Sequence, residues 1–140
     1  MITYVDTSTL LKLIIDEEGS DRAELIWQAA DTLASVSLIV VEARAALAAA
    51  HRHGRLTTPE HRRAKATLAI LVGDLHLITA TDELLEQAAD LAETEALRGY
   101  DAVHLAAALS VQAMLLTSTD TALCDAATRR GLHIANPLLP

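Results

Sequence analysis

Four acidic residues stand where predicted strands end or predicted helices begin: Asp6, Glu42, Asp101 and Asp120. Each lies in or beside an apolar segment, where a charged side chain is costly unless another group compensates it. If they converged on one pocket, two carboxylates about 4 Å apart would repel by on the order of 4 kcal/mol at an effective dielectric constant of roughly 20. A divalent cation would remove that repulsion, because hard cations prefer oxygen ligands. The four acids therefore predict a metal site, provided that the fold brings them together.

The elements that must position these acids follow an alternating pattern. Short apolar segments alternate with helical patterns, which is typical of a parallel sheet covered by helices. The predicted strands are Ile2–Val5, Leu33–Val36, Leu75–Ile78, Met114–Thr117 and, with the weakest pattern, Leu132–Ala135. We expect a three-layer α/β/α fold with a central parallel sheet of four to five strands, formed by a single domain over residues 1–140.

Seven helices are predicted between and after these strands, and most begin at a Ser or Thr cap. The predicted caps are Thr7 and Ser8, then Ser20, Ser37, Thr57 or Thr58, and Thr81, and the last two helices begin near Tyr100 and Thr121. In open α/β sheets, ligands bind beyond the carboxyl ends of the strands. Asp6, Asp101 and Asp120 can therefore converge at that edge. Glu42, in the second turn of the third helix, can join them only if that helix leans over the same edge.

The charge of the chain is unevenly distributed. A net charge of −8 argues, taken alone, against nucleic-acid binding. Residues 44–65, however, carry six Lys or Arg against one Glu, whereas residues 74–95 carry seven Asp or Glu and no Lys or Arg. Two solvated helical faces of opposite sign would explain this pattern. Alternatively, the basic segment contacts phosphates, in which case Arg44, Arg52 and Arg55 are candidates for binding a nucleic-acid backbone.

The cysteine count and the apolar segments exclude several classes of protein. Cys124 is the only cysteine, so an internal disulfide and a Cys-based zinc site are excluded. The longest nearly apolar stretch, residues 102–116, is shorter than the roughly 20 residues that a membrane span needs. No basic region precedes the first strand, as a secretory signal would require. We expect a cytoplasmic protein that does not associate with membranes.

Several segments together resemble PIN-domain proteins of the VapC toxin type. They are VDTSTLLKL, Ser37 followed by Glu42, RGYDAVHLAAAL, and LLTSTDTAL followed by GLHIANP, with matching order and spacing from Ile2 to about Pro137. The resemblance implies an α/β/α fold, metal-dependent ribonuclease activity, a homodimer and a cognate VapB-like antitoxin that blocks the site. The acidic quartet of the family matches Asp6, Glu42, Asp101 and Asp120, and its hydroxyl residues match Ser8 and Ser118.

The expected chemistry is hydrolysis of RNA phosphodiester bonds by an endoribonuclease. One or two Mg²⁺ ions, for which Mn²⁺ can substitute, would be held mainly by Asp6 and Asp101, with Asp120 and Glu42 binding directly or through water. A metal-activated water would attack the phosphorus in line, and this needs no histidine base. His104 lies three residues after Asp101 on the same helix face. It could bind metal, although a packed or hydrogen-bonded histidine is the simpler interpretation.

Alternatives to this function remain open. The same metal chemistry could act on single-stranded DNA or a flap, and a PIN fold could serve as a non-catalytic binding module. A phosphoacceptor domain is disfavoured, because Ser8 occupies the position where a haloacid-dehalogenase-like signature needs a second Asp. A receiver domain needs a late Lys, and no Lys follows Lys65.

Overall fold

Five short parallel strands form the centre of the protein, for which a computed structural model describes residues 1–140. The strands are β1 (Ile2–Val5), β2 (Thr32–Val36), β3 (His76–Ile78), β4 (Leu115–Thr117) and β5 (His133–Ala135). Their order in the sheet is β3-β2-β1-β4-β5, and every neighbouring pair is parallel. The predicted parallel sheet is confirmed, and its weakest predicted strand is present as β5.

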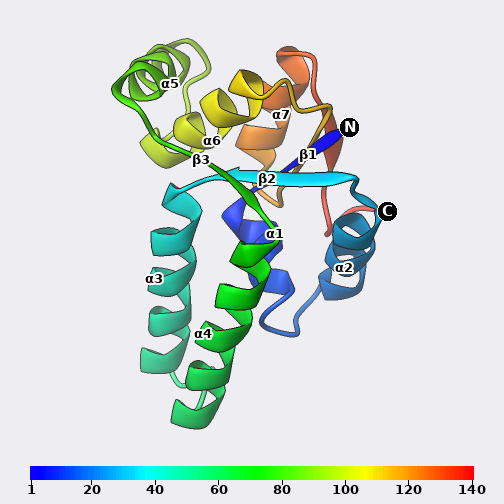
Figure 1. Ribbon diagram of the computed structural model, residues 1–140, viewed down its shortest axis with the longest axis vertical. Coiled ribbons are helices and arrows are strands. Elements are labelled where there is room, and N and C mark those ends of the chain that lie inside the picture. Colours follow the sequence, from blue (N-terminus) through cyan, green and yellow to red (C-terminus); the bar gives the residue numbers. More distant parts are fainter.

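Seven helices cover the two faces of the sheet (Figure 1). They are α1 (Thr7–Lys12), α2 (Ser20–Ala29), α3 (Leu38–Arg52), α4 (Thr58–Gly73), α5 (Asp82–Thr94), α6 (Gly99–Ser110) and α7 (Thr121–Arg129). Helices α1 to α4 lie on one face and α5 to α7 on the other, which gives the predicted three layers. None of the seven combines the length and the apolar character that crossing a membrane requires.

Alternation along β1 divides the core into two clusters. Successive side chains of a strand point to opposite faces of the sheet. Accordingly, Tyr4 packs with Leu105 and Leu116 on the side of α5 to α7, whereas Val5 packs with Leu10 and other apolar residues of α1, α3 and α4. All of these named side chains are almost completely buried. Burial on both faces fixes the register of β1 and, with it, the position of Asp6 at its carboxyl end.

The predicted caps of α4 and α5 are correct and those of α1 and α2 are wrong, while Ser37 holds the N-cap position of α3 without a side-chain capping bond. Thr57 caps α4 through a capping box with Glu60, and the Thr81 hydroxyl accepts a bond from the Leu84 N–H. Asp6, and not Thr7 or Ser8, holds the N-cap position of α1. Thr7 and Ser8 are the first two residues inside α1, and their hydroxyls donate hydrogen bonds to Glu42 and Asp6.

The second helix begins differently from the prediction. The residue before α2 is Gly19 rather than Ser20, and its φ is 89°. A left-handed backbone favours glycine, because other side chains clash there. The Ser20 hydroxyl accepts a bond from the Glu17 N–H in the preceding turn.

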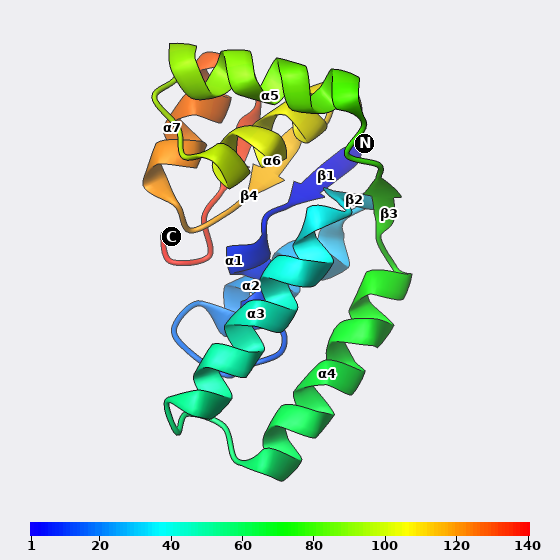
Figure 2. The same cartoon turned by 90° about the vertical axis from the view of Figure 1, so that its left-hand side faces the viewer.

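Helices α3 and α4 form an antiparallel pair that extends away from the sheet (Figure 2).

Candidate active site

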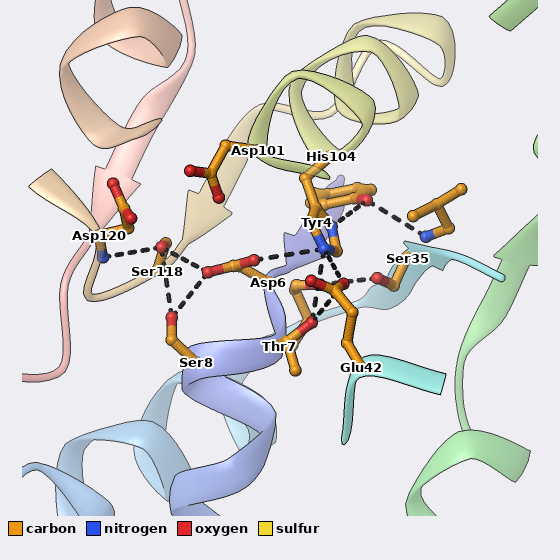
Figure 3. Close-up of polar contacts among 12 residues, drawn as sticks. Tyr4, Asp6, Thr7, Ser8, Ser35, Glu42, Asp101, His104, Ser118 and Asp120 are labelled. Atoms are coloured by element: carbon orange, nitrogen blue, oxygen red, sulfur yellow. Dashed lines mark hydrogen bonds and ion pairs between the residues drawn. The ribbon is translucent and has the colours of Figure 1, made fainter. Parts of the chain in front are cut away.

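The strand order places the candidate site beside β1. From β1 the chain continues to β2 and β3 on one side of the sheet, and later places β4 and β5 on the other side. This change of direction is the point where open α/β sheets bind ligands. Asp6 directly follows β1, and Asp120 lies three residues after β4. Figure 3 shows that Asp101 of α6 and Glu42 of α3 lie around the same region, so the fold brings the four acids to one edge.

Asp6 is held by two hydroxyl groups. Its side chain is almost completely buried, and its Oδ2 accepts hydrogen bonds from the Ser8 and Ser118 hydroxyls, each at 2.7 Å. Backbone N–H groups bind these hydroxyls in turn: Thr119 donates to Ser8 and Asp120 donates to Ser118, each at 3.0 Å. Both serines that the resemblance pointed to thus contact Asp6. Their bonds fix the orientation of the Asp6 carboxylate.

Glu42 is held by a buried histidine and a threonine. Its Oε1 accepts a hydrogen bond from the Thr7 hydroxyl at 2.9 Å and lies 2.6 Å from His104 Nε2. His104 Nε2 is also 3.5 Å from Asp6 Oδ1. The histidine therefore contacts both acids at this end of the site (Figure 3). No hydrogen bond from the protein reaches Glu42 Oε2, so this oxygen can face a ligand.

The other nitrogen of His104 is occupied as well. Nδ1 lies 2.8 Å from the hydroxyl of Tyr4, which also accepts a bond from the Val36 N–H at 3.2 Å. Burial lowers the pKa of His104, but the hydrogen bond to Glu42 and the charges of Asp6, Glu42 and Asp101 outweigh it and raise the pKa overall. With both ring nitrogens occupied, the structure favours the hydrogen-bonded interpretation of this histidine over a metal ligand.

Asp101 and Asp120 are joined by an arginine instead of hydroxyls. Arg98 Nε lies 3.3 Å from Asp101 Oδ2, and its Nη2 lies 3.2 Å from Asp120 Oδ2. The other Asp120 oxygen, Oδ1, accepts the Leu123 N–H at 3.0 Å and caps α7. Asp120 is therefore a helix cap and a member of the acidic site at once. The sequence analysis missed Arg98, although its position three residues before Asp101 places the two on neighbouring positions of α6.

The acids influence one another electrostatically. Burial raises the pKa of the Asp101 carboxyl, and the charges of Asp120 and Asp6 raise it further, while Arg98 opposes them. The part of this rise that Asp120 and Asp6 cause comes from negative charge close to Asp101. The carboxylates of Asp101 and Asp120 raise the pKa of Arg98 as well, because they stabilise its positive charge. The site thus favours an added positive charge.

The side chains of the site are of the types that bind a hard divalent cation, but they do not surround a common point as the ligands of a bound ion do. The donors are four carboxylates and two hydroxyls, which are the oxygen ligands that Mg²⁺ and Mn²⁺ prefer. No three His, Cys, Asp or Glu side chains are already spaced to enclose a metal ion. Arg98 accounts for part of this spacing, since Asp101 and Asp120 each direct one oxygen to it.

The basic residues predicted to contact a nucleic-acid backbone lie outside this network. Arg44 and Arg52 are exposed on α3, and neither forms an ion pair with the four acids. Arg55 Nη2 forms an ion pair with Glu17 Oε2 at 3.1 Å. The structure does not bring these three arginines to the acids, and their contact with RNA stays a prediction.

Comparison with known proteins places the chain in a family. The sequence model of the PIN domain family matches residues 3–128 of this chain. The chain belongs to the PIN-domain family. Among sequences, this PIN-domain chain is 39% identical over 110 residues to Ribonuclease VapC45 of Mycobacterium tuberculosis, which covers 79% of this chain and 76% of that protein.

Solved structures agree on the fold. PAE2754 from Pyrobaculum aerophilum superimposes with a TM-score of 0.72 at 23% identity, covering 96% of this chain and 92% of that one. A toxin-antitoxin complex from Klebsiella pneumoniae gives a TM-score of 0.65 at 19% identity, covering 96% and 97%. At these identities the likeness shows the PIN fold alone. The six side chains that the resemblance pointed to all lie along one edge of this PIN fold (Figure 3).

Proposed function

We propose that this PIN-domain protein is a Mg²⁺-dependent endoribonuclease and the toxin of a type II toxin–antitoxin pair. The observation that carries the proposal is the meeting of Asp6, Glu42, Asp101 and Asp120 at the carboxyl edge of the sheet. The 39% identity to a ribonuclease of the VapC type supports RNA as the substrate. In this proposal residues 1–140 form one nuclease domain that acts in the cytoplasm.

The roles of the acids follow from how each is held. Asp6 and Asp101 would hold Mg²⁺, or Mn²⁺ in its place, while Glu42 and Asp120 bind it directly or through water. When bound, the ion would activate a water and offset the charge that develops on the phosphoryl group. Ser8 and Ser118 keep the Asp6 carboxylate in one orientation. His104 and Thr7 do the same for Glu42 by occupying its Oε1.

The partner would be a small VapB-like antitoxin. The acidic edge presents at least one carboxylate, Asp120, that is partly open to solvent, with 25% of its side chain exposed. A cationic tail of a partner protein could form ion pairs there, and an apolar tail could cover the edge. A similar fold forms part of the toxin-antitoxin complex from Klebsiella pneumoniae. We also include a homodimer in the proposal, from the family resemblance.

Cleavage assays test the proposal directly. Purified protein is incubated with tRNA, rRNA, single-stranded DNA and a DNA flap, in Mg²⁺, Mn²⁺ or EDTA. We expect cleavage of RNA that requires a metal and falls by about 100-fold or more in Asp6→Asn and in Asp101→Asn, as when a key electrostatic group is removed. Asp90→Asn, which removes an equal charge from the exposed face of α5, is the matched control.

Each other result has a clear meaning. Undiminished cleavage in EDTA would contradict the role of the metal. Cleavage confined to single-stranded DNA or the flap would show that DNA, and not RNA, is the substrate. If no nucleic acid is cut under any condition, the fold serves as a binding module. A folded Asp6→Asn variant with normal activity would contradict the assignment of the site.

A further inference from the structure

Arg98 is the only Lys or Arg that forms an ion pair with any of the four acids. It lies at the N-cap position of α6 and connects the first turn of α6 to the first residue before α7. Its two contacts use different nitrogens, Nε to Asp101 and Nη2 to Asp120. One guanidinium therefore spans two carboxylates that are 19 residues apart in the chain.

On Asp120, Arg98 occupies the oxygen that a metal would need. Asp120 Oδ1 is committed to the α7 cap, so Oδ2 is the oxygen left for a ligand, and Arg98 contacts it at 3.2 Å. On Asp101 the contacted oxygen is again Oδ2. A guanidinium and a divalent cation are both positive and cannot share these two oxygens without strong repulsion. Binding of one metal by both Asp101 and Asp120 therefore requires Arg98 to leave Asp120 Oδ2.

Arg98 is able to move. About 70% of its side chain is exposed, and ion pairs with so much exposure stabilise a structure only slightly. Its Cζ lies 5.8 Å from the centre of the Tyr100 ring, which is itself half-exposed. This contact with the aromatic face does not involve the carboxylates, so the guanidinium can keep it when the ion pairs open. Since Arg98 is the N-cap residue of α6, the released guanidinium would stay close to the acidic site.

We propose that Arg98 is a tethered counter-ion that competes with the metal for Asp101 and Asp120 and, once displaced, binds a phosphate of the RNA. The inference rests on the proposed function. The guanidinium suits both positions, because its planar donors match carboxylate and phosphate oxygens alike. Metal binding and substrate binding are coupled in this arrangement, since the cation that leaves the acids becomes available to the substrate.

Metal titration tests the first half of the inference without measuring activity. Calorimetric titration with Mn²⁺ is carried out on the wild type, Arg98→Gln and Arg98→Lys. We expect Arg98→Gln to lower the Kd for Mn²⁺ by about 2- to 10-fold, as two exposed ion pairs cease to compete. The Kd of Arg98→Lys should lie between those of the wild type and Arg98→Gln, because a lysine can contact one acid at a time. Arg130→Gln removes the same charge from an ion pair with Glu95 and should leave the Kd unchanged.

Steady-state kinetics on RNA test the second half. Arg98→Gln should raise KM by several-fold while kcat changes little, because the lost contact is to the RNA backbone and not to the reacting atoms. An unchanged or weaker Kd for Mn²⁺ in a folded Arg98→Gln variant would overturn the counter-ion role. An unchanged KM would overturn the phosphate contact. If the wild type itself neither binds Mn²⁺ nor cuts RNA, the proposed function fails, which is a separate result.

Discussion

The two halves of the acidic site hold their negative charge in different ways. In the hydrogen-bonded half, Asp6 and Glu42 are fixed by serine and threonine hydroxyls and by His104. In the arginine-bridged half, Asp101 and Asp120 are held by the exposed side chain of Arg98. Buried hydrogen bonds place a carboxylate firmly, whereas an exposed ion pair is easily opened. We infer that the first half is built before any metal arrives and that the second half completes its geometry afterwards.

The two halves also differ in which elements support them. The partners of the hydrogen-bonded half come from β1, α1, α3, α6 and the turn after β4, so its geometry depends on how the two layers of helices pack on the sheet. The arginine-bridged half depends on the first turns of α6 and α7 alone. Mutations should therefore affect global stability in the first half and metal binding in the second.

The largest difference is expected between His104→Ala and Arg98→Ala. Removal of the fully buried imidazole leaves a cavity and deprives Glu42 Oε1 and the Tyr4 hydroxyl of a partner. We expect a loss of about 2–4 kcal/mol in the free energy of unfolding for His104→Ala. Arg98→Ala should change it by no more than about 0.5 kcal/mol. Urea unfolding measures both, and equal losses would contradict the division into two halves.

A smaller effect is expected from Tyr4→Phe. This substitution keeps the ring but removes the hydroxyl that accepts the Val36 N–H and contacts His104 Nδ1. We expect a loss of about 1–3 kcal/mol in unfolding free energy, because the Val36 N–H is left buried without its partner. RNA cleavage should fall by about 10-fold, because the group that positions Glu42 has lost its own support. Unchanged stability and activity would show that His104 needs no second contact.

The pH dependence of metal binding is a further difference between the two halves, and it comes from Asp101. Burial and then the charges of Asp120 and Asp6 raise the pKa of Asp101, so protons compete with metal for it at a higher pH than for an ordinary Asp. A raised carboxyl pKa also means that protonation favours the folded state, so the stability due to this group declines as the pH rises through the folded pKa. Mn²⁺ affinity should therefore weaken on acidification. In Arg98→Gln the Mn²⁺ affinity should begin to weaken at a higher pH than in the wild type, because Arg98 no longer lowers the pKa of Asp101.

Calorimetry at a series of pH values measures this dependence. If Mn²⁺ affinity weakens on acidification in Asp101→Asn as much as in the wild type, a group other than Asp101 causes the pH dependence. A folded wild type whose Mn²⁺ affinity stays constant down to the ordinary range of Asp, at about pH 4, would contradict the raised pKa.

The smallest effect concerns Cys124, a buried residue of α7. Burial raises the pKa of its thiol to about 11, and the charges of Asp6, Asp120 and Asp125 contribute. Since the thiolate is the reactive form, a disulfide reagent should label the folded protein slowly at neutral pH and faster as the pH approaches that value. Bound Mn²⁺ should speed the labelling slightly by offsetting the nearby charges. Rapid labelling of the native protein at neutral pH would contradict the burial of this thiol.

Much of the fold follows from local patterns in the sequence. The five strands appear within one residue of their predicted ends, because apolar runs bounded by polar turns are a local signal. The caps at Thr57 and Thr81 were predicted for the same reason. The caps at Thr7, Ser8 and Ser20 were not correct, because those hydroxyls bind partners elsewhere. A local pattern cannot show that a hydroxyl has a competing partner.

The sequence by itself determined which acids stand at the ends of which elements, since the residue types and their order suffice for that. Only the tertiary structure decided their partners: His104 for Glu42, Arg98 for Asp120, and Glu17 for Arg55. These pairs are 62, 22 and 38 residues apart in the chain. The first two pairs meet because β1 lies between β2 and β4, so the ends of distant segments share one edge, whereas Glu17 and Arg55 meet between the α1–α2 and α3–α4 connections. Strand order is set by the packing of the whole core, which no short stretch of sequence records.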